Sequence, residues 1–132
     1  MQESANHTYL HLYSGKFKIV TTVRVREDNS VVVELLKFKV PPEYREQFIQ
    51  KDAEIWTMAI ASFPGFLGKE VWIDPNQPTE VILVIRWATR EQWKSIPQVL
   101  LEEISKQFAH QMGNISYELL DSSEYRVCNP PS

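Results

Sequence analysis

The chain has 132 residues, 43% of them hydrophobic and 23% charged, which fits one globular domain and excludes a disordered or fibrous chain. Its net charge of -3 comes without a run of Lys or Arg, so neither a nucleic-acid surface nor a polybasic membrane anchor is expected. The sequence also lacks a signal peptide, a membrane-spanning apolar stretch and any cysteine besides Cys128. We therefore expect a cytoplasmic protein without disulfides or a thiolate metal site.

The first strand of the predicted domain covers residues 31–40, a run of β-branched and aromatic side chains. Pro41 and Pro42 end this strand and begin a helix, because proline suits the first helical turn. The helix extends to Pro64 and Gly65, and its apolar side chains recur at helical spacing. This stripe consists of Tyr44, Phe48, Ile55, Trp56, Ala59, Ile60 and Phe63.

A β-hairpin is predicted next, with strands over residues 66–73 and 79–88 joined by the turn-forming residues 74–78. A second helix is expected to begin with a capping box formed by Thr89 and Gln92.

The apolar stripe of this second helix contains Pro97, so a kink or a restart is expected there, and Gly113 fits the helix end. A last strand covers residues 116–127, and a break in it is expected near residues 121–123. The resulting order, β-α-β-β-α-β, indicates a ferredoxin-like α+β fold with a four-stranded antiparallel sheet.

We assign this domain to residues 31–128. Residues 1–30 stand outside it as an N-terminal arm, and their alternating pattern is compatible with an extra strand.

The strand predicted over residues 79–88 is apolar on both faces. Val81, Leu83, Ile85 and Trp87 point one way, and Ile82 and Val84 point the other way together with Arg86. Two helices can cover only one face of a four-stranded sheet, which leaves a face of roughly 350 Å². That area is near the largest apolar patch that a monomer normally exposes, so we expect a homodimer that buries this face.

A family resemblance is carried by three stretches, VVVELLKFKVPPEYREQFIQKDAEIW, FPGFLGKEVWIDPNQPTEVILVIRW and REQWKSIP. They resemble a family of small cyanobacterial proteins within the dimeric α+β barrel superfamily, which includes the antibiotic-biosynthesis monooxygenases. The resemblance covers about residues 31–128 and implies that two sheets face each other across a dimer and leave a cavity between them. Oxygenation of phenolic substrates without a cofactor is known in this superfamily.

The haem-degrading members of the superfamily use an Asn in the first strand, a Trp at the end of the third strand and a His early in the second helix. Only Trp87 matches this set. The first strand offers Val33, Glu34 and Leu35 instead, and His110 comes too late in the second helix. We therefore expect neither haem nor another cofactor.

Glu34 and Arg86 interrupt strands that are otherwise apolar on both faces. If Glu34 faces a cavity, burial raises its pKa and makes it a candidate general acid or base, and Arg86 could hold a carboxylate or phenolate. The alternative is structural, with Glu34 paired to Arg86 or Lys37, or Arg86 paired to Glu70. We predict that Glu34 and Arg86 share the face opposite the helices and either pair or converge on one pocket.

The four tryptophans divide into two groups. Trp56 and Trp93 lie on helical stripes and fit core packing, whereas Trp72 and Trp87 are as compatible with an aromatic-ligand pocket as with packing. His110 suits a helix end, and no second His or Cys follows at ligand spacing, so no metal site is expected.

Two functions stay open. In one, the dimer binds or oxidises a small aromatic or acidic molecule in a cofactor-independent, monooxygenase-like cavity. Glu34 is then the catalytic residue, and Trp72, Arg86 and Trp87 are the ligand-binding residues. In the other, the protein is a non-catalytic structural or interaction module whose barrel is filled by side chains. A cavity of about 300 Å³ or more, lined by these groups, favours the first function.

Overall fold

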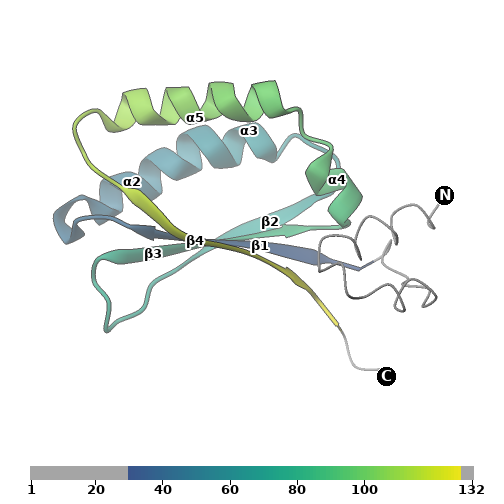
Figure 1. Ribbon diagram of the computed structural model, residues 1–132, viewed down its shortest axis with the longest axis horizontal. Coiled ribbons are helices and arrows are strands. Elements are labelled where there is room, and N and C mark those ends of the chain that lie inside the picture. The colour runs from purple at the N-terminus through teal and green to yellow at the C-terminus, as the bar shows by residue number, and fades with distance from the viewer. Residues whose placement is uncertain (1–29, 129–132) are drawn as a thin grey trace, which may run out of the picture.

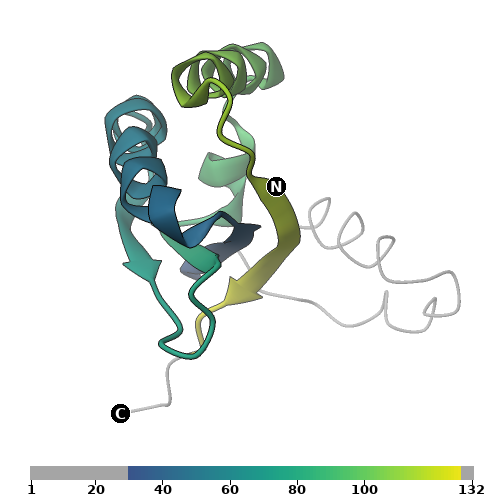
Figure 2. The ribbon, with the colours of Figure 1, turned by 90° about the vertical axis from the view of Figure 1, so that its left-hand side faces the viewer.

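The protein is described by a computed structural model that covers residues 30–128, so the expected N-terminal arm, except Ser30, lies outside the described residues. One antiparallel sheet has the spatial order β2-β3-β1-β4. Its strands are β1 (Val32–Lys39), β2 (Phe66–Trp72), β3 (Glu80–Trp87) and β4 (Glu118–Arg126). The helices cover one face of this sheet (Figure 1), as the perpendicular view in Figure 2 also shows. The predicted ferredoxin-like α+β fold is confirmed.

One helical segment connects β1 to β2. Its parts are the 3-10 turn η2 (Pro42–Tyr44), α2 (Arg45–Lys51), the π-helical turn η3 (Asp52–Thr57) and α3 (Met58–Ile60). In η3 the backbone N–H of Met58 donates to the carbonyl of Ala53, five residues earlier.

The apolar stripe predicted for this segment needs two corrections. Tyr44 is 40% exposed, whereas Asp52, which the stripe did not include, is only 3% exposed. Tyr44 belongs to the short initial 3-10 turn, and Asp52 stands four residues after the buried Phe48, on the same side of the helix.

The second helical segment follows the prediction closely. Thr89 caps α4 (Arg90–Lys94), because its Oγ1 accepts a hydrogen bond of 3.1 Å from the Gln92 backbone N–H. Pro97 precedes α5 (Gln98–Met112), which confirms the restart, and Gly113 follows α5 with a φ of 62°. Among the described helices, none is long and apolar enough to cross a membrane.

Strand β4 runs without a break but contains a bulge. Its register against β1 shifts between Lys37, which pairs with Asp121, and Phe38, which pairs with Leu119. Leu120 is therefore the extra residue. The break expected near residues 121–123 is therefore absent: the strand is continuous, and its bulge lies one residue earlier.

The strand register decides which side chains face the helices. On β3, Ile85 pairs with Glu34 of β1, and Arg86 pairs with Val33. Paired residues lie on the same face of a sheet and successive residues on opposite faces, so Glu34 faces the helices and Arg86 does not.

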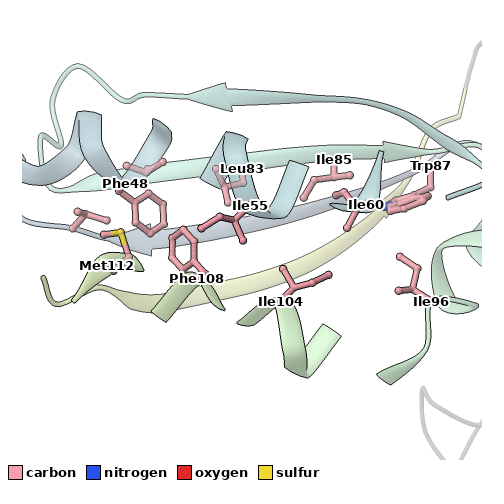
Figure 3. Close-up of a cluster of buried hydrophobic side chains, with 12 residues drawn as sticks. Phe48, Ile55, Ile60, Leu83, Ile85, Trp87, Ile96, Ile104, Phe108 and Met112 are labelled. Carbon is pink, nitrogen blue, oxygen red and sulfur yellow. The ribbon is translucent and has the colours of Figure 1, made fainter. Parts of the chain in front are cut away.

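The hydrophobic core lies between the helices and the helix-facing side of the sheet (Figure 3). Figure 3 shows Trp87 and Ile96 at one end of this core and Phe48 and Met112 at the other. The core consists of Val40, Phe48, Ile55, Ile60, Val81, Leu83, Ile85, Trp87, Ile96, Ile104, Phe108 and Met112.

Candidate functional site

A cavity of about 380 Å³ lies between the helices and the sheet. Its walls are mostly apolar and include three tryptophans, and its size is within the range of small-molecule sites. Two lining residues, Ser105 of α5 and Leu119 of β4, are exposed, so the cavity reaches the surface between these two elements. The polar or ionisable lining residues are Glu34, Asp52, Lys69, Ser105 and Tyr117.

The prediction that Glu34 and Arg86 share the helix-free face is wrong. The cavity on the helix side is lined by Glu34 and Trp87, whereas Trp72 and Arg86 do not line it. The cause is the register, because Glu34 pairs with Ile85 rather than with its neighbour Arg86. Of the four candidate residues, the structure therefore brings together only Glu34 and Trp87. Ligand binding by Trp72 and Arg86 stays a prediction.

Both structural partners that we considered for Glu34 are engaged elsewhere. Lys37 Nζ lies 3.9 Å from a carboxylate oxygen of Glu80, and Arg86 lies 3.9 Å from Glu70. Among residues 30–128, Glu34 has no ion-pair partner. Its carboxyl group is thus a partly buried acid that faces a cavity without a neutralising contact.

The surroundings of Glu34 act on its pKa in both directions. Burial is the largest effect and raises the pKa above its ordinary value. The Trp87 indole and the positive charges of Lys94 and Lys69 oppose this increase, and the negative charge of Glu124 adds to it. A carboxyl group with a raised pKa is better matched to proton transfer near neutral pH than an ordinary glutamate.

Trp87 presents an unsatisfied donor at the same place. Its side chain is 1% exposed, and its Nε1 has no hydrogen-bond partner in the described part of the chain. The indole is close enough to affect the pKa of Glu34, but the two groups do not reach the geometry of a hydrogen bond. A buried donor without a partner costs about 1–3 kcal/mol, so an acceptor atom of a ligand would be stabilised here.

A buried ion pair forms another part of the cavity wall. Lys69 Nζ on β2 lies 2.6 Å from Asp52 Oδ2 on η3, and the two side chains are only 6% and 4% exposed. Burial raises the pKa of Asp52, and the charge and hydrogen bond of Lys69 oppose this effect.

Arg86 and Trp72 lie together on the opposite face of the sheet. Glu70 connects them, because its Oε1 accepts a hydrogen bond of 2.8 Å from Trp72 Nε1 and lies 3.9 Å from Arg86. The predicted pairing of Arg86 with Glu70 is therefore the one that the structure contains.

The remaining candidates are placed as follows. Trp56 and Trp93 pack against the core, as predicted, and they also line the cavity. His110 lies in the exposed last turn of α5. Within the described residues, no three His, Cys, Asp or Glu side chains are grouped closely enough to hold a metal ion.

Three ionisable lining residues escaped the sequence prediction. Asp52 follows Phe48 by four residues, so its place on the apolar stripe was a usable signal. Lys69 alternates with Val71 in β2, but a charged residue in an edge strand usually faces solvent. Tyr117 precedes β4 and packs against Phe108, with ring centroids 5.2 Å apart, a contact that only the fold reveals.

Comparisons with solved structures support the fold class. A protein of Chloroflexus aurantiacus, provisionally assigned as an antibiotic biosynthesis monooxygenase, is 21% identical, with a TM-score of 0.54 over 78% of this chain and 98% of its own. A protein of Nitrosomonas europaea with the same provisional assignment is 13% identical, with a TM-score of 0.56 over 82% and 99%. At these identities the likeness shows a shared fold.

The sequence comparison gives the family. The profile of the antibiotic biosynthesis monooxygenases matches residues 31–96. Together with the fold, this match places the protein among the dimeric α+β barrel proteins. The chain belongs to the antibiotic biosynthesis monooxygenase family. A search of curated proteins found no match. The expected cyanobacterial source stays a prediction.

Proposed function

We propose that the cavity binds a small hydroxyaromatic molecule and that the protein oxidises it with dioxygen, without a cofactor. One observation carries this proposal: the same aromatic cavity is lined by a partly buried Glu34 without an ion-pair partner and by Trp87 with an unsatisfied N–H. Membership of a monooxygenase family supports the reaction type. The cavity lies within one copy, between the helices and the sheet, so it offers a ligand site whether or not side chains fill the barrel between the two sheets.

Each group has a defined role in this proposal. The Glu34 carboxylate accepts the proton of the aromatic hydroxyl group, which leaves an electron-rich aryloxide. Trp87 Nε1 donates a hydrogen bond to the aryloxide oxygen and thereby stabilises its charge. Apolar walls keep water away from the ring and strengthen both interactions.

The redox step balances with dioxygen alone, as 1-naphthol illustrates. Dioxygen bonds to the ring carbon opposite the hydroxyl group, and the resulting hydroperoxide loses water through cleavage of its O–O bond. One oxygen atom enters the quinone and the other leaves as water. The substrate supplies all the electrons, so 1-naphthol and dioxygen give 1,4-naphthoquinone and water.

The test is the oxidation of 1-naphthol under labelled dioxygen. We expect quinone with one labelled oxygen atom, and a decrease in rate of about 100-fold for Glu34→Gln, the usual scale of general-base catalysis. Arg86→Gln is the matched control, because Arg86 lies on the other face of the sheet. Absence of turnover by the wild type, or an equal loss in both variants, would contradict the proposal.

We also propose that the protein acts as a cytoplasmic homodimer that buries the helix-free face. Three observations support the dimer: the family resemblance, the apolar Ile82 and Leu35 on that face, and the 45% exposure of Trp72 beside them. In this arrangement Trp72 and Arg86 lie against the second copy, away from the cavity on the helix side.

A further inference from the structure

The buried Lys69–Asp52 pair is not explained by stability alone. Both side chains are almost fully buried, and desolvation offsets much of the attraction in such a pair. A well-packed apolar pair of similar size is often at least as stable. Because Lys69 and Asp52 also line the cavity, their contact with a ligand offers a reason for their presence.

The register places Lys69 in line with the proposed proton acceptor. Ile85 of β3 pairs with Lys69 on one side and with Glu34 on the other. The three side chains therefore form one row on the helix-facing side, and two strand spacings separate Lys69 from Glu34 by about 10 Å between Cα atoms. Ile85 therefore forms an apolar surface between Glu34 and Lys69. An aromatic bicycle can span the distance between these two polar residues.

The chemistry of the pair favours an uncharged acceptor. A lysine ammonium has three N–H donors, and Asp52 is the one partner that the described residues provide for it. Donor capacity therefore remains for a ligand, whereas the charge of Lys69 is already neutralised. A ligand carboxylate here would add a second negative charge, besides that of Asp52, next to the single positive charge of Lys69. Two negative charges and one positive charge in an apolar wall are unfavourable.

We propose that Lys69, positioned by Asp52, is a specificity-determining residue that selects ligands with a carbonyl oxygen at the end of the ring system remote from the hydroxyl group. This inference rests on the proposed function, because it assumes that the hydroxyl group lies at Glu34 and Trp87. It adds a second recognised group and fixes the direction in which the ligand lies across Ile85.

Three naphthols test this selectivity by calorimetry in the full-length protein: 2-naphthol, 6-acetyl-2-naphthol and 6-hydroxy-2-naphthoate. The wild type is expected to bind the acetyl compound at least about ten-fold more tightly than 2-naphthol, the effect of one hydrogen bond to a charged donor. It is expected to disfavour the naphthoate.

Two variants and a control separate selectivity from folding. The double variant Asp52→Asn/Lys69→Met removes both charges, and we expect it to lose the preference for the acetyl compound over 2-naphthol. Asp52→Asn alone leaves Lys69 without its counter-ion, so the ligand preference of this variant should move toward the naphthoate. Lys94→Met is the control, because Lys94 also affects Glu34 electrostatically but is exposed and does not line the cavity.

The outcomes distinguish this inference from the function on which it rests. Equal binding of 2-naphthol and its acetyl derivative by the wild type, or a preference that survives in the double variant, overturns the role of Lys69 and leaves the hydroxyaromatic site intact. Failure of all three naphthols to bind overturns both.

Discussion

Glu34 is a partly buried acid of β1 that faces the cavity and has no ion-pair partner among residues 30–128. In the sequence, an acid within an apolar strand was a visible anomaly, but the cavity was expected on the helix-free face and not on the helix side, where Glu34 lies. Its face was not predictable, because the face depends on how β1 aligns with β3. Trp87 was recognisable as a candidate, whereas its unsatisfied N–H depends on atoms contributed by several elements.

The raised pKa of Glu34 predicts a specific dependence of stability on pH. Burial favours the neutral carboxyl group, so Glu34 contributes most to stability below its unfolded pKa, and this contribution is lost as pH rises through the higher folded pKa. Glu34→Gln keeps a neutral group at all pH values. The free energy of unfolding of the variant, relative to wild type, should therefore increase from about pH 4.5 upward, by at most about 1.4 kcal/mol per pH unit.

Urea denaturation at a series of pH values measures this difference. Glu118→Gln, at an exposed position of β4, is the control and should show little change with pH. A difference for Glu34→Gln that is constant from pH 4 to pH 8 would show that Glu34 is not electrostatically unusual.

At the scale of elements, local signals predicted most of the boundaries and missed one irregularity. Pro42, the Thr89 cap, Pro97 and Gly113 each determined a helix end through local chemistry. The π-helical turn η3 had no such signal. Ile55 of η3 and Ile60 of α3 are both buried in the core. In a regular α-helix, residues five apart point about 140° away from each other, so the wider π-helical turn brings both side chains to the core side.

The connection from α3 to β2 depends on a glycine. Gly65 has a φ of +94°, and a Cβ atom at this position would lie 2.6 Å from the Gln92 Cβ. Its carbonyl also accepts a hydrogen bond of 2.7 Å from the Ala88 N–H. Gly65→Ala should therefore lower the free energy of unfolding by about 2–4 kcal/mol, through backbone strain and overpacking together.

Gly113→Ala is the matched comparison for this prediction. Gly113 also has a positive φ, of 62°, but a Cβ atom there would meet nothing within 4 Å. Its alanine variant should lose only the strain contribution, about 1–2 kcal/mol. Equal losses in the two variants, measured by denaturant unfolding, would show that the contact with Gln92 is unimportant.

At the scale of the whole molecule, the order of elements followed from the sequence, but the place of the cavity did not. Hydrophobic periodicity and turn residues predicted the β-α-β-β-α-β arrangement. The cavity was expected on the helix-free face, whereas it lies between the helices and the sheet. Cavities depend on how side chains such as Leu36, Leu83 and Trp56 fail to fill the space between layers, which no local pattern encodes.

The proposed dimer is tested by a charge on the helix-free face. Trp72 is 45% exposed and pairs with Ile82 on that face, so Trp72→Glu changes the surface rather than the core. We expect the wild type to sediment as a dimer at micromolar concentration and Trp72→Glu as a folded monomer. Val99→Glu, at a 70% exposed position on α5, should remain dimeric. A monomeric wild type, or a dimer in both variants, would be incompatible with this interface.

A crystal structure of the protein with 1-naphthol would show most directly whether the cavity on the helix side is the ligand site. We expect the ring to lie over Ile85, with its oxygen within hydrogen-bond distance of both Glu34 and Trp87 Nε1. Naphthol bound only beside Trp72 and Arg86, or a cavity closed by side chains at saturating naphthol, would contradict it.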